Sequence, residues 1–168
     1  PQDWSANSVD LVAEQSLVLP SASAQVVAVS DFDNDDRSDL LVEEVDGSLA
    51  VGEIQPDGSV STTVVAQLGA DEWLVDSGDF DGDGRSDLLI ANDTRADLSL
   101  WRLNGSSVLS VESAGSFDPT AKPVAAGDYD GDRRRDLCWL RTDGLLEFWY
   151  MDRTSHETVT RSFSYTKW

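Results

Sequence analysis

The stretch Asp79-Phe-Asp-Gly-Asp-Gly-Arg-Ser-Asp-Leu-Leu-Ile90 decides the fold, because it occurs three times with small variations. The other copies are Asp31-Phe-Asp-Asn-Asp-Asp-Arg-Ser-Asp-Leu-Leu-Val42 and Asp128-Tyr-Asp-Gly-Asp-Arg-Arg-Arg-Asp-Leu-Cys-Trp139. The three copies align without gaps, and their starts are 48 and 49 residues apart. Self-similarity at a nearly constant period is typical of a repeat protein, in which each repeat is one supersecondary unit.

The sequence around each copy repeats as well. A short apolar segment that ends in small residues precedes the copy, as at 26–30, and an apolar run follows it, as at 40–42. Two further apolar or alternating stretches come next, separated by turn signals such as Asp46-Gly47 and Asn104-Gly105. Such pairs between short β-rich runs are typical of hairpins, and no sustained helical period is present. Each repeat therefore predicts four antiparallel strands in up-and-down order.

A period of about 40 to 50 residues with four strands per repeat is typical of β-propeller blades. The second and third strands are apolar at successive positions, as in 148–151, which predicts sheets covered on both faces. We therefore predict an all-β, β-propeller-type fold of about three blades in a single domain, residues 1–168. The expected parts are an end strand of a further repeat at 1–20 and blades at 21–69, 70–117 and 118–168.

Three blades are fewer than the roughly four to eight of closed propellers. The expectation is therefore a partial propeller, or part of a ring that another chain or further sequence completes. A homo-oligomer is one way to complete such a ring.

The charge of the chain excludes some partners. It has 32 Asp and Glu against 12 Lys and Arg, a net charge of −20. Such a chain repels phosphate backbones and anionic membrane surfaces, so we expect neither nucleic-acid binding nor membrane insertion. Twelve of the acids lie at positions 1, 3, 5 and 9 of the three repeated loops, which indicates a local use for them.

In the second loop, odd spacing turns alternate side chains toward one centre. Four carboxylates gathered there repel one another unless a cation lies between them. Hard oxygen ligands in that number suit Ca²⁺ better than Mg²⁺ or Zn²⁺. Gly82 and Gly84 allow the positive φ angles that the curl needs. We expect Arg85 to supply its backbone carbonyl while its side chain faces away. The four carboxylates belong to Asp79, Asp81, Asp83 and Asp87.

The pattern D-[FY]-D-x-D-x-R-x-D-L resembles the calcium loop of FG-GAP or VCBS-type repeats, the blades of integrin-α-like propellers. The resemblance covers residues 21–168 and implies up to three Ca²⁺ ions, each held by the aspartates and the position 7 carbonyl. In the first loop the implied ligands are Asp31, Asp33, Asp35, Arg37 and Asp39. In the second they are Asp79, Asp81, Asp83, Arg85 and Asp87. In the third they are Asp128, Asp130, Asp132, Arg134 and Asp136.

The three loops differ at the positions where glycine is usual. The first has Asn34 and Asp36, which tolerate left-handed geometry, and the third has Arg133, which tolerates it less well. We therefore predict that calcium affinity falls from the second loop to the first and then to the third.

Other candidate residues give weaker signals. No nucleophile motif of the Gly-x-Ser-x-Gly type occurs, and the clustered acids are assigned to metal, so we expect no enzyme. Cys138, the single cysteine, lies in an apolar run and is expected to be a buried structural thiol. Trp73 precedes an inner strand and is a weak candidate for stacking on a ligand.

These observations predict a calcium-stabilised extracellular recognition or adhesion module that binds carbohydrate or protein. A secreted bacterial protein fits the lack of disulfides. Two alternatives stay open. The chain could be an accessory, non-catalytic domain of a larger secreted polysaccharide-active enzyme, or a structural half-propeller that assembles with itself.

Overall fold

The computed structural model describes residues 19, 21–55, 59–152 and 156–161, and within these ranges every regular element is a β-strand. The first sheet contains β1 (Gln25–Ser30), β2 (Asp39–Glu43), β3 (Ser48–Ile54) and β4 (Val60–Gln67). The second contains β5 (Glu72–Gly78), β6 (Asp87–Asn92), β7 (Asp97–Asn104) and β8 (Ser107–Ser116). The third contains β9 (Lys122–Gly127), β10 (Asp136–Leu140), β11 (Leu146–Met151) and β12 (His156–Arg161).

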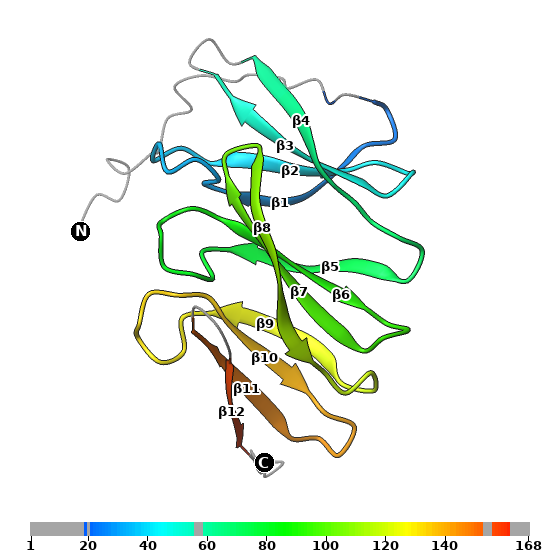
Figure 1. Ribbon diagram of the computed structural model, residues 1–168, viewed down its shortest axis with the longest axis vertical. Coiled ribbons are helices and arrows are strands. Elements are labelled where there is room, and N and C mark those ends of the chain that lie inside the picture. Colours follow the sequence, from blue (N-terminus) through cyan, green and yellow to red (C-terminus); the bar gives the residue numbers. More distant parts are fainter. Residues whose placement is uncertain (1–18, 20, 56–58, 153–155, 162–168) are drawn as a thin grey trace, which may run out of the picture.

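Each sheet has four strands in sequential order, and every neighbouring pair is antiparallel. The three sheets stack one above another, and the described part of the chain does not close into a ring or barrel (Figure 1). The prediction of an all-β fold with propeller-type blades is confirmed. The end strand expected at 1–20 lies outside the described residues, apart from Leu19.

Tight turns set the hairpins. Between β2 and β3, the main-chain N–H of Gly47 donates to the carbonyl of Glu44 at 2.9 Å, and Gly47 has a φ of 83°. Gly144 occupies the equivalent turn between β10 and β11 with a φ of 82°. Because L-residues rarely adopt these angles, the Asp-Gly pairs read from the sequence fix where the strands reverse.

Two apolar cores lie between successive sheets, and β6 contributes to both. Leu88 and Ile90 pack in the core shared with the first sheet, whereas Leu89 and Ala91 pack in the core shared with the third. All six residues of β6 are buried. Fully burying an aliphatic side chain of this size is worth about 1.5 to 3 kcal/mol, so the middle sheet is stabilised from both sides.

The stacking places the three Asp loops at the same end of the sheets, on the left in Figure 1. Main-chain hydrogen bonds join them from sheet to sheet. Ser86 donates its N–H to the carbonyl of Asp31, and Arg135 donates its N–H to the carbonyl of Asp79, each at 2.8 Å. The eighth residue of one loop therefore bonds the first residue of the preceding loop.

Candidate metal sites

Each Asp loop connects the first and second strands of a sheet. The carboxylates at loop positions 1, 3 and 9 come together there, with one oxygen from each lying within 4.8 Å of the others. The sequence places the first two in the loop and the third at the start of the second strand. The three groups are Asp31, Asp33 and Asp39; Asp79, Asp81 and Asp87; and Asp128, Asp130 and Asp136.

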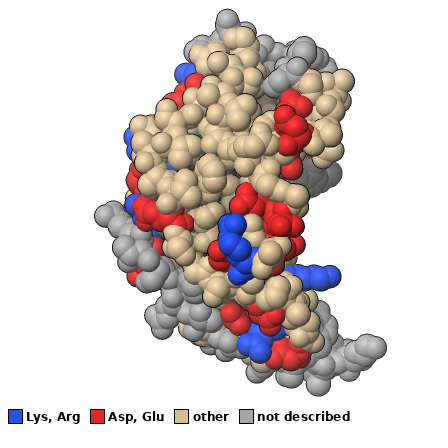
Figure 2. Space-filling model, turned by 45° about the vertical axis from the view of Figure 1, so that its right-hand side comes forward, with Lys and Arg blue, Asp and Glu red and all other residues tan. Residues whose placement is uncertain are grey.

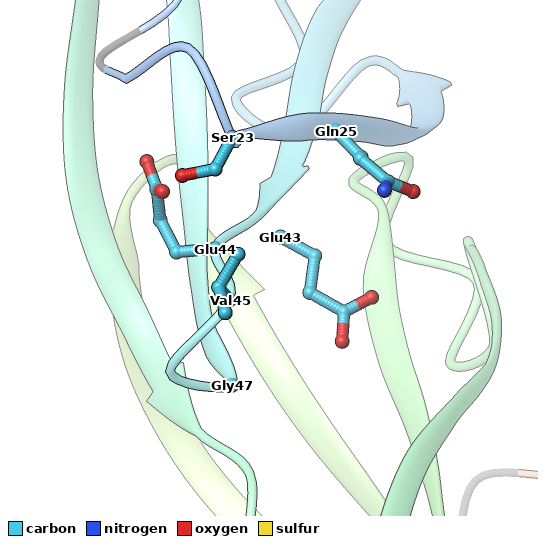
Figure 3. Close-up of a pocket in the computed structure, with 6 residues that line it drawn as sticks. All are labelled: Ser23, Gln25, Glu43, Glu44, Val45 and Gly47. Carbon is cyan, nitrogen blue, oxygen red and sulfur yellow. The ribbon is translucent and has the colours of Figure 1, made fainter.

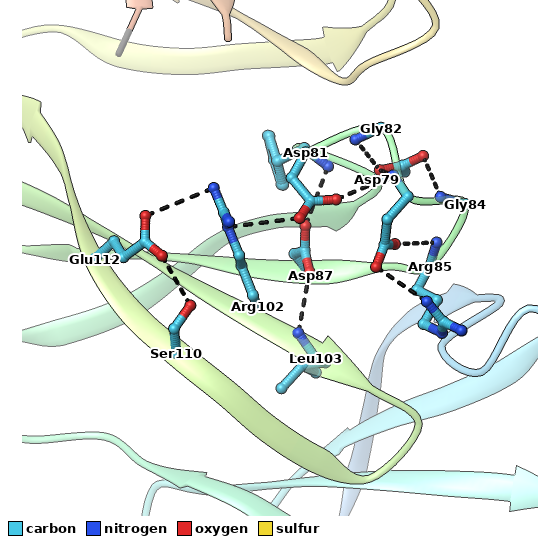
Figure 4. A network of polar contacts seen from close by, with 12 residues as sticks. Asp79, Asp81, Gly82, Gly84, Arg85, Asp87, Arg102, Leu103, Ser110 and Glu112 are labelled. Atoms are coloured by element: carbon cyan, nitrogen blue, oxygen red, sulfur yellow. Dashed lines mark hydrogen bonds and ion pairs between the residues drawn. The ribbon is translucent and has the colours of Figure 1, made fainter. Parts of the chain in front are cut away.

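The first aspartate of each loop holds the loop backbone in its curled conformation by accepting main-chain hydrogen bonds. In the second loop, Oδ1 of Asp79 accepts the main-chain N–H of Gly82 at 2.6 Å, and its Oδ2 accepts that of Gly84 at 2.9 Å (Figure 4). Asp31 and Asp128 accept the equivalent N–H groups in the other two loops. The same carboxylate that is expected to ligate the ion therefore also holds the loop in shape.

The positive φ angles expected in these loops are present. Gly82 and Gly84 have φ of 81° and 87°. Asn34 and Asp36 have φ of 63° and 64°, and Arg133 has φ of 73°. Left-handed geometry at a residue with a long side chain costs roughly 1 to 2 kcal/mol, less for Asn and Asp. The first and third loops therefore contain backbone strain that the second lacks.

The ninth aspartate is the buried member of each group. Asp87 is only 1% exposed; Oδ1 accepts the N–H of Leu103 at 3.0 Å and Oδ2 that of Phe80 at 3.3 Å. Burial, together with the charges of Asp81 and Asp83, raises the pKa of Asp87 to about 7. Burial also raises the pKa of Asp39 and of Asp136. Two hydrogen bonds thus compensate only part of the cost of burying this charge, and a cation would supply the rest.

The third-position aspartate of the first loop is destabilised in its charged form as well. Burial is the largest cause, and the negative charges of Asp35 and Asp31 add to it, so the pKa of Asp33 is raised. A divalent ion among these carboxylates would oppose each of these effects.

The fifth-position aspartates do not join the three-carboxylate groups. Oδ1 of Asp83 accepts the N–H of Arg85 at 2.8 Å, and the Asp83 carboxylate forms an ion pair with the Arg85 guanidinium at 3.1 Å. Arg37 pairs with Asp35, and Arg134 pairs with Asp132, in the same way. The position 7 side chain therefore points toward the fifth aspartate of its own loop, outside the group of three converging carboxylates.

The donor set fits a hard divalent cation. All the converging atoms are carboxylate oxygens. Ca²⁺ accepts six to eight such ligands in variable geometry, whereas Zn²⁺ prefers nitrogen and sulfur and Mg²⁺ retains its waters. The geometry therefore suits Ca²⁺ best among these ions.

The match to a known family falls on the second and third loops. Residues 79–139 match the model of the FG-GAP-like repeat. This segment is therefore similar to an FG-GAP-like repeat. The FG-GAP-like segment begins at the first aspartate of the second loop and ends in β10, beyond the last aspartate of the third loop. Repeats of the FG-GAP type often bind Ca²⁺ and are typically extracellular and non-catalytic. No curated protein matches the chain.

The aromatic candidate lies at the other end of the second sheet. Trp73, in β5, is half-buried against the core between the second and third sheets, and its Nε1–H donates to Oδ1 of Asp93 at 2.8 Å. Part of its ring surface is therefore already used in packing. Cys138 is buried in β10, as expected.

Sequence reasoning missed a polar depression at the first sheet (Figure 3). It has a volume of about 220 Å³ and lies at the end of β1 and β2 opposite the Asp loop. No motif marks it, because its residues come from separate turns and strand ends. The lining residues are Ser23, Gln25, Glu43, Glu44, Val45 and Gly47.

The chain has a net charge of −20. On the face shown in Figure 2, acidic side chains gather in separate groups, and basic side chains adjoin some of them. Among the described residues, no helix is long and apolar enough to cross a membrane.

Proposed function

We propose that this chain is a calcium-stabilised extracellular module for recognition or adhesion, without catalytic activity of its own. One observation carries the proposal: the same group of three aspartates recurs at the same end of three stacked sheets. Up to three Ca²⁺ ions would bind, one in each loop. The three converging aspartates of each loop, at positions 1, 3 and 9, would hold the ion. The aspartate at position 5 would join them on binding, together with the carbonyls of Arg37, Arg85 and Arg134.

The ions would act as structural ligands. They would neutralise carboxylates that folding forces together, so the free energy of binding would add to the free energy of folding. Extracellular calcium modules have Kd values of about 10⁻⁴ to 10⁻³ M, a range that suits calcium concentrations outside cells. Three ions would change the net charge from −20 to −14.

Calorimetric titration and thermal unfolding test the calcium function. We expect Ca²⁺ to bind with a stoichiometry of up to three and to raise Tm, and we expect Mg²⁺ at the same concentration to do much less. An unchanged Tm in 10 mM CaCl₂ and in chelator, with no heat of binding, would refute the proposal.

For the recognition function, we propose a glycan or protein ligand. Screening the calcium-loaded chain against a glycan array and against extracellular matrix proteins tests this. Saturable binding that is lost on chelation would support it. If the chain alone degraded a polysaccharide, the non-catalytic proposal would be wrong, and the accessory-domain alternative would also need revision.

One observation favours self-assembly as a second candidate. The bond from the eighth residue of one loop to the first residue of the preceding loop occurs at both junctions between sheets. Among the described residues, no further loop donates to the carbonyl of Asp128. A second copy that stacked its first sheet on the third sheet would supply Ser38 for this bond. Light scattering tests it: twice the chain mass supports pairing, and a monomer at all concentrations excludes it.

A further inference from the structure

A position on the third strand of each sheet lies beside the Asp loop and carries a different charge in each repeat. In every sheet the third strand donates a main-chain N–H to the ninth aspartate of the loop. The residue immediately before that donor is acidic in the first sheet, basic in the second and uncharged in the third. These residues are Glu53, Arg102 and Tyr150.

In the second sheet, the basic residue contacts an expected metal ligand. Nε of Arg102 lies 3.5 Å from Oδ2 of Asp81, and its Nη2 lies 3.5 Å from Oε2 of Glu112 on β8 (Figure 4). The side chains of Arg102 and Asp81 are only 22% and 15% exposed. Water and salt therefore screen this pair less than they would screen a surface pair.

In the first sheet, the equivalent residue adds negative charge. Gly105 of the β7–β8 turn approaches the first loop and donates its N–H to the carbonyl of Phe32 at 2.8 Å. A Cβ atom on Gly105 would lie 3.3 Å from Oε1 of Glu53 and 3.4 Å from Cβ of Asp33. The Glu53 carboxylate and Asp33 therefore both lie close to Gly105, beside the three carboxylates of the first loop that are expected to hold the ion.

We propose that this position sets the order of calcium affinity, with the first loop tightest, the second weakest and the third between them. The proposal rests on the calcium function proposed above, and it moves the second loop from the tightest place in the order that the glycine pattern predicts to the weakest. A guanidinium beside Asp81 competes with the ion for that carboxylate and repels it. A carboxylate beside Asp33 attracts the ion, and Tyr150 does neither.

Backbone strain does not offset this effect. The first and third loops hold left-handed residues at the positions where glycine is usual. This strain is a cost of folding the loop, while the affinity of the folded loop depends on the charges that the ion meets. At an effective dielectric constant near 20, one unit charge a few ångströms away is worth several kcal/mol. A tenfold difference in affinity between the first and second loops is well within that range.

Titration of the ¹⁵N-labelled chain with CaCl₂, followed by amide NMR shifts, tests the order loop by loop. The amides of Asn34 and Asp36 report the first loop, Gly82 and Gly84 the second, and Gly131 the third. We expect the second loop of the unmodified chain to have a Kd about tenfold higher than the first. If no loop amide shifts, the calcium function is wrong. If all shift but the second loop is tightest, only this inference is overturned.

Charge variants test the cause. Arg102→Gln should tighten the second loop about tenfold, and Glu53→Gln should weaken the first by a similar factor. Arg95→Gln and Glu43→Gln make the same charge changes at the opposite end of the sheets and should alter both Kd values less than twofold. If Arg102→Gln weakened the second loop, the arginine would be holding Asp81 in place and the proposal would fail.

A surface variant provides an independent test if substitution at Arg102 disturbs folding. The side chain of Glu112 is 44% exposed, and its Oε1 accepts a hydrogen bond from Ser110 Oγ at 2.9 Å. Glu112→Gln removes the outer partner of Arg102, so the guanidinium should act more strongly on Asp81. We expect the second loop to weaken about twofold or more, and an unchanged or tighter second loop would contradict the proposal.

Discussion

The main-chain N–H of Ser86 donates to the carbonyl oxygen of Asp31 at 2.8 Å, across the junction between the first and second sheets. Asp31 is the first residue of one Asp loop and Ser86 the eighth residue of the next. A change in the shape of one loop can therefore reach the main chain of its neighbour through this hydrogen bond. The Arg135 to Asp79 bond joins the second and third loops in the same way.

This connection predicts that the loops do not bind calcium independently. Asp33→Ala removes a ligand of the first loop, and we expect it to weaken binding at the second loop about fivefold, near the lower end of typical coupling energies. Among the described residues, no hydrogen bond joins the third loop to the first. The third loop should therefore change much less, and it serves as the internal control. Amide NMR titration measures all three, and an unchanged second loop would show that the sites are uncoupled.

Substitution within the second loop should lower calcium-dependent stability. At 100 times its Kd, an ion bound only by the folded state stabilises a protein by about 2.7 kcal/mol. For a chain of this size, that corresponds to roughly 5 to 10 °C in Tm. We expect Asp81→Ala to lose this increment in calcium but to melt close to the unmodified chain in chelator. Asp71→Ala, at an exposed acid outside the loops, should keep the full calcium response.

The calcium-free chain should become less stable as the pH rises from 5 to 8. Burial raises the pKa of Asp87 to about 7, so the folded state binds this proton more tightly than the unfolded state does. The resulting stabilisation is present below the ordinary pKa near 4 and is lost as the pH rises through 7. Asp39 and Asp136 act in the same direction.

Urea unfolding in calcium-free buffer at pH 5 and pH 8 measures this dependence. The Asn side chain of Asp87→Asn cannot titrate, so the free energy of unfolding of this variant should change less between pH 5 and pH 8. The substitution also removes one acceptor oxygen. In saturating calcium the stability should instead increase with pH, because protons then compete with the ion for the carboxylates. A calcium-free chain that is equally stable at both pH values would mean that the carboxylate is solvated in the fold.

The junction between the second and third sheets should not tolerate a side chain at Gly78. A Cβ there would overlap Cδ of Arg135, whose guanidinium pairs with Asp76. Gly78→Ala should therefore displace Arg135, break this ion pair and cost about 1 to 3 kcal/mol, as overpacking does. At Gly127, the equivalent residue of β9, a Cβ would meet nothing closer than 3.9 Å. Gly127→Ala should leave the urea midpoint nearly unchanged, and equal effects of the two substitutions would argue against this packing.

Much of the fold could be predicted from the sequence because the repeat fixes it three times. The Asp-Gly and Asn-Gly pairs marked the strand reversals, and the apolar run in β6 indicated a sheet covered on both faces. The three-carboxylate groups follow from the same spacing, since positions 1, 3 and 9 converge wherever the loop curls. Asn34 and Arg133 adopt the left-handed angles that their places in the pattern require.

Side-chain contacts across strands and between sheets could not be predicted in this way. The pairing of Arg102 with Asp81 depends on which face of β7 lies against the loop, and the pairing of Arg135 with Asp76 depends on how two sheets stack. The ion pair between Arg85 and Asp83 was missed because position 7 was assigned only a backbone role. The depression at Glu43 and Gln25 joins residues that no spacing rule connects.

The single sulfhydryl of the chain has a practical consequence. Cys138 lies in the middle of the third sheet with 5% of its surface exposed, and burial raises its pKa. A thiol reagent can reach it only when that sheet separates or opens. The rate at which Cys138 is labelled, measured at different calcium concentrations, would therefore report how often the third sheet opens. No engineered probe is needed for this measurement.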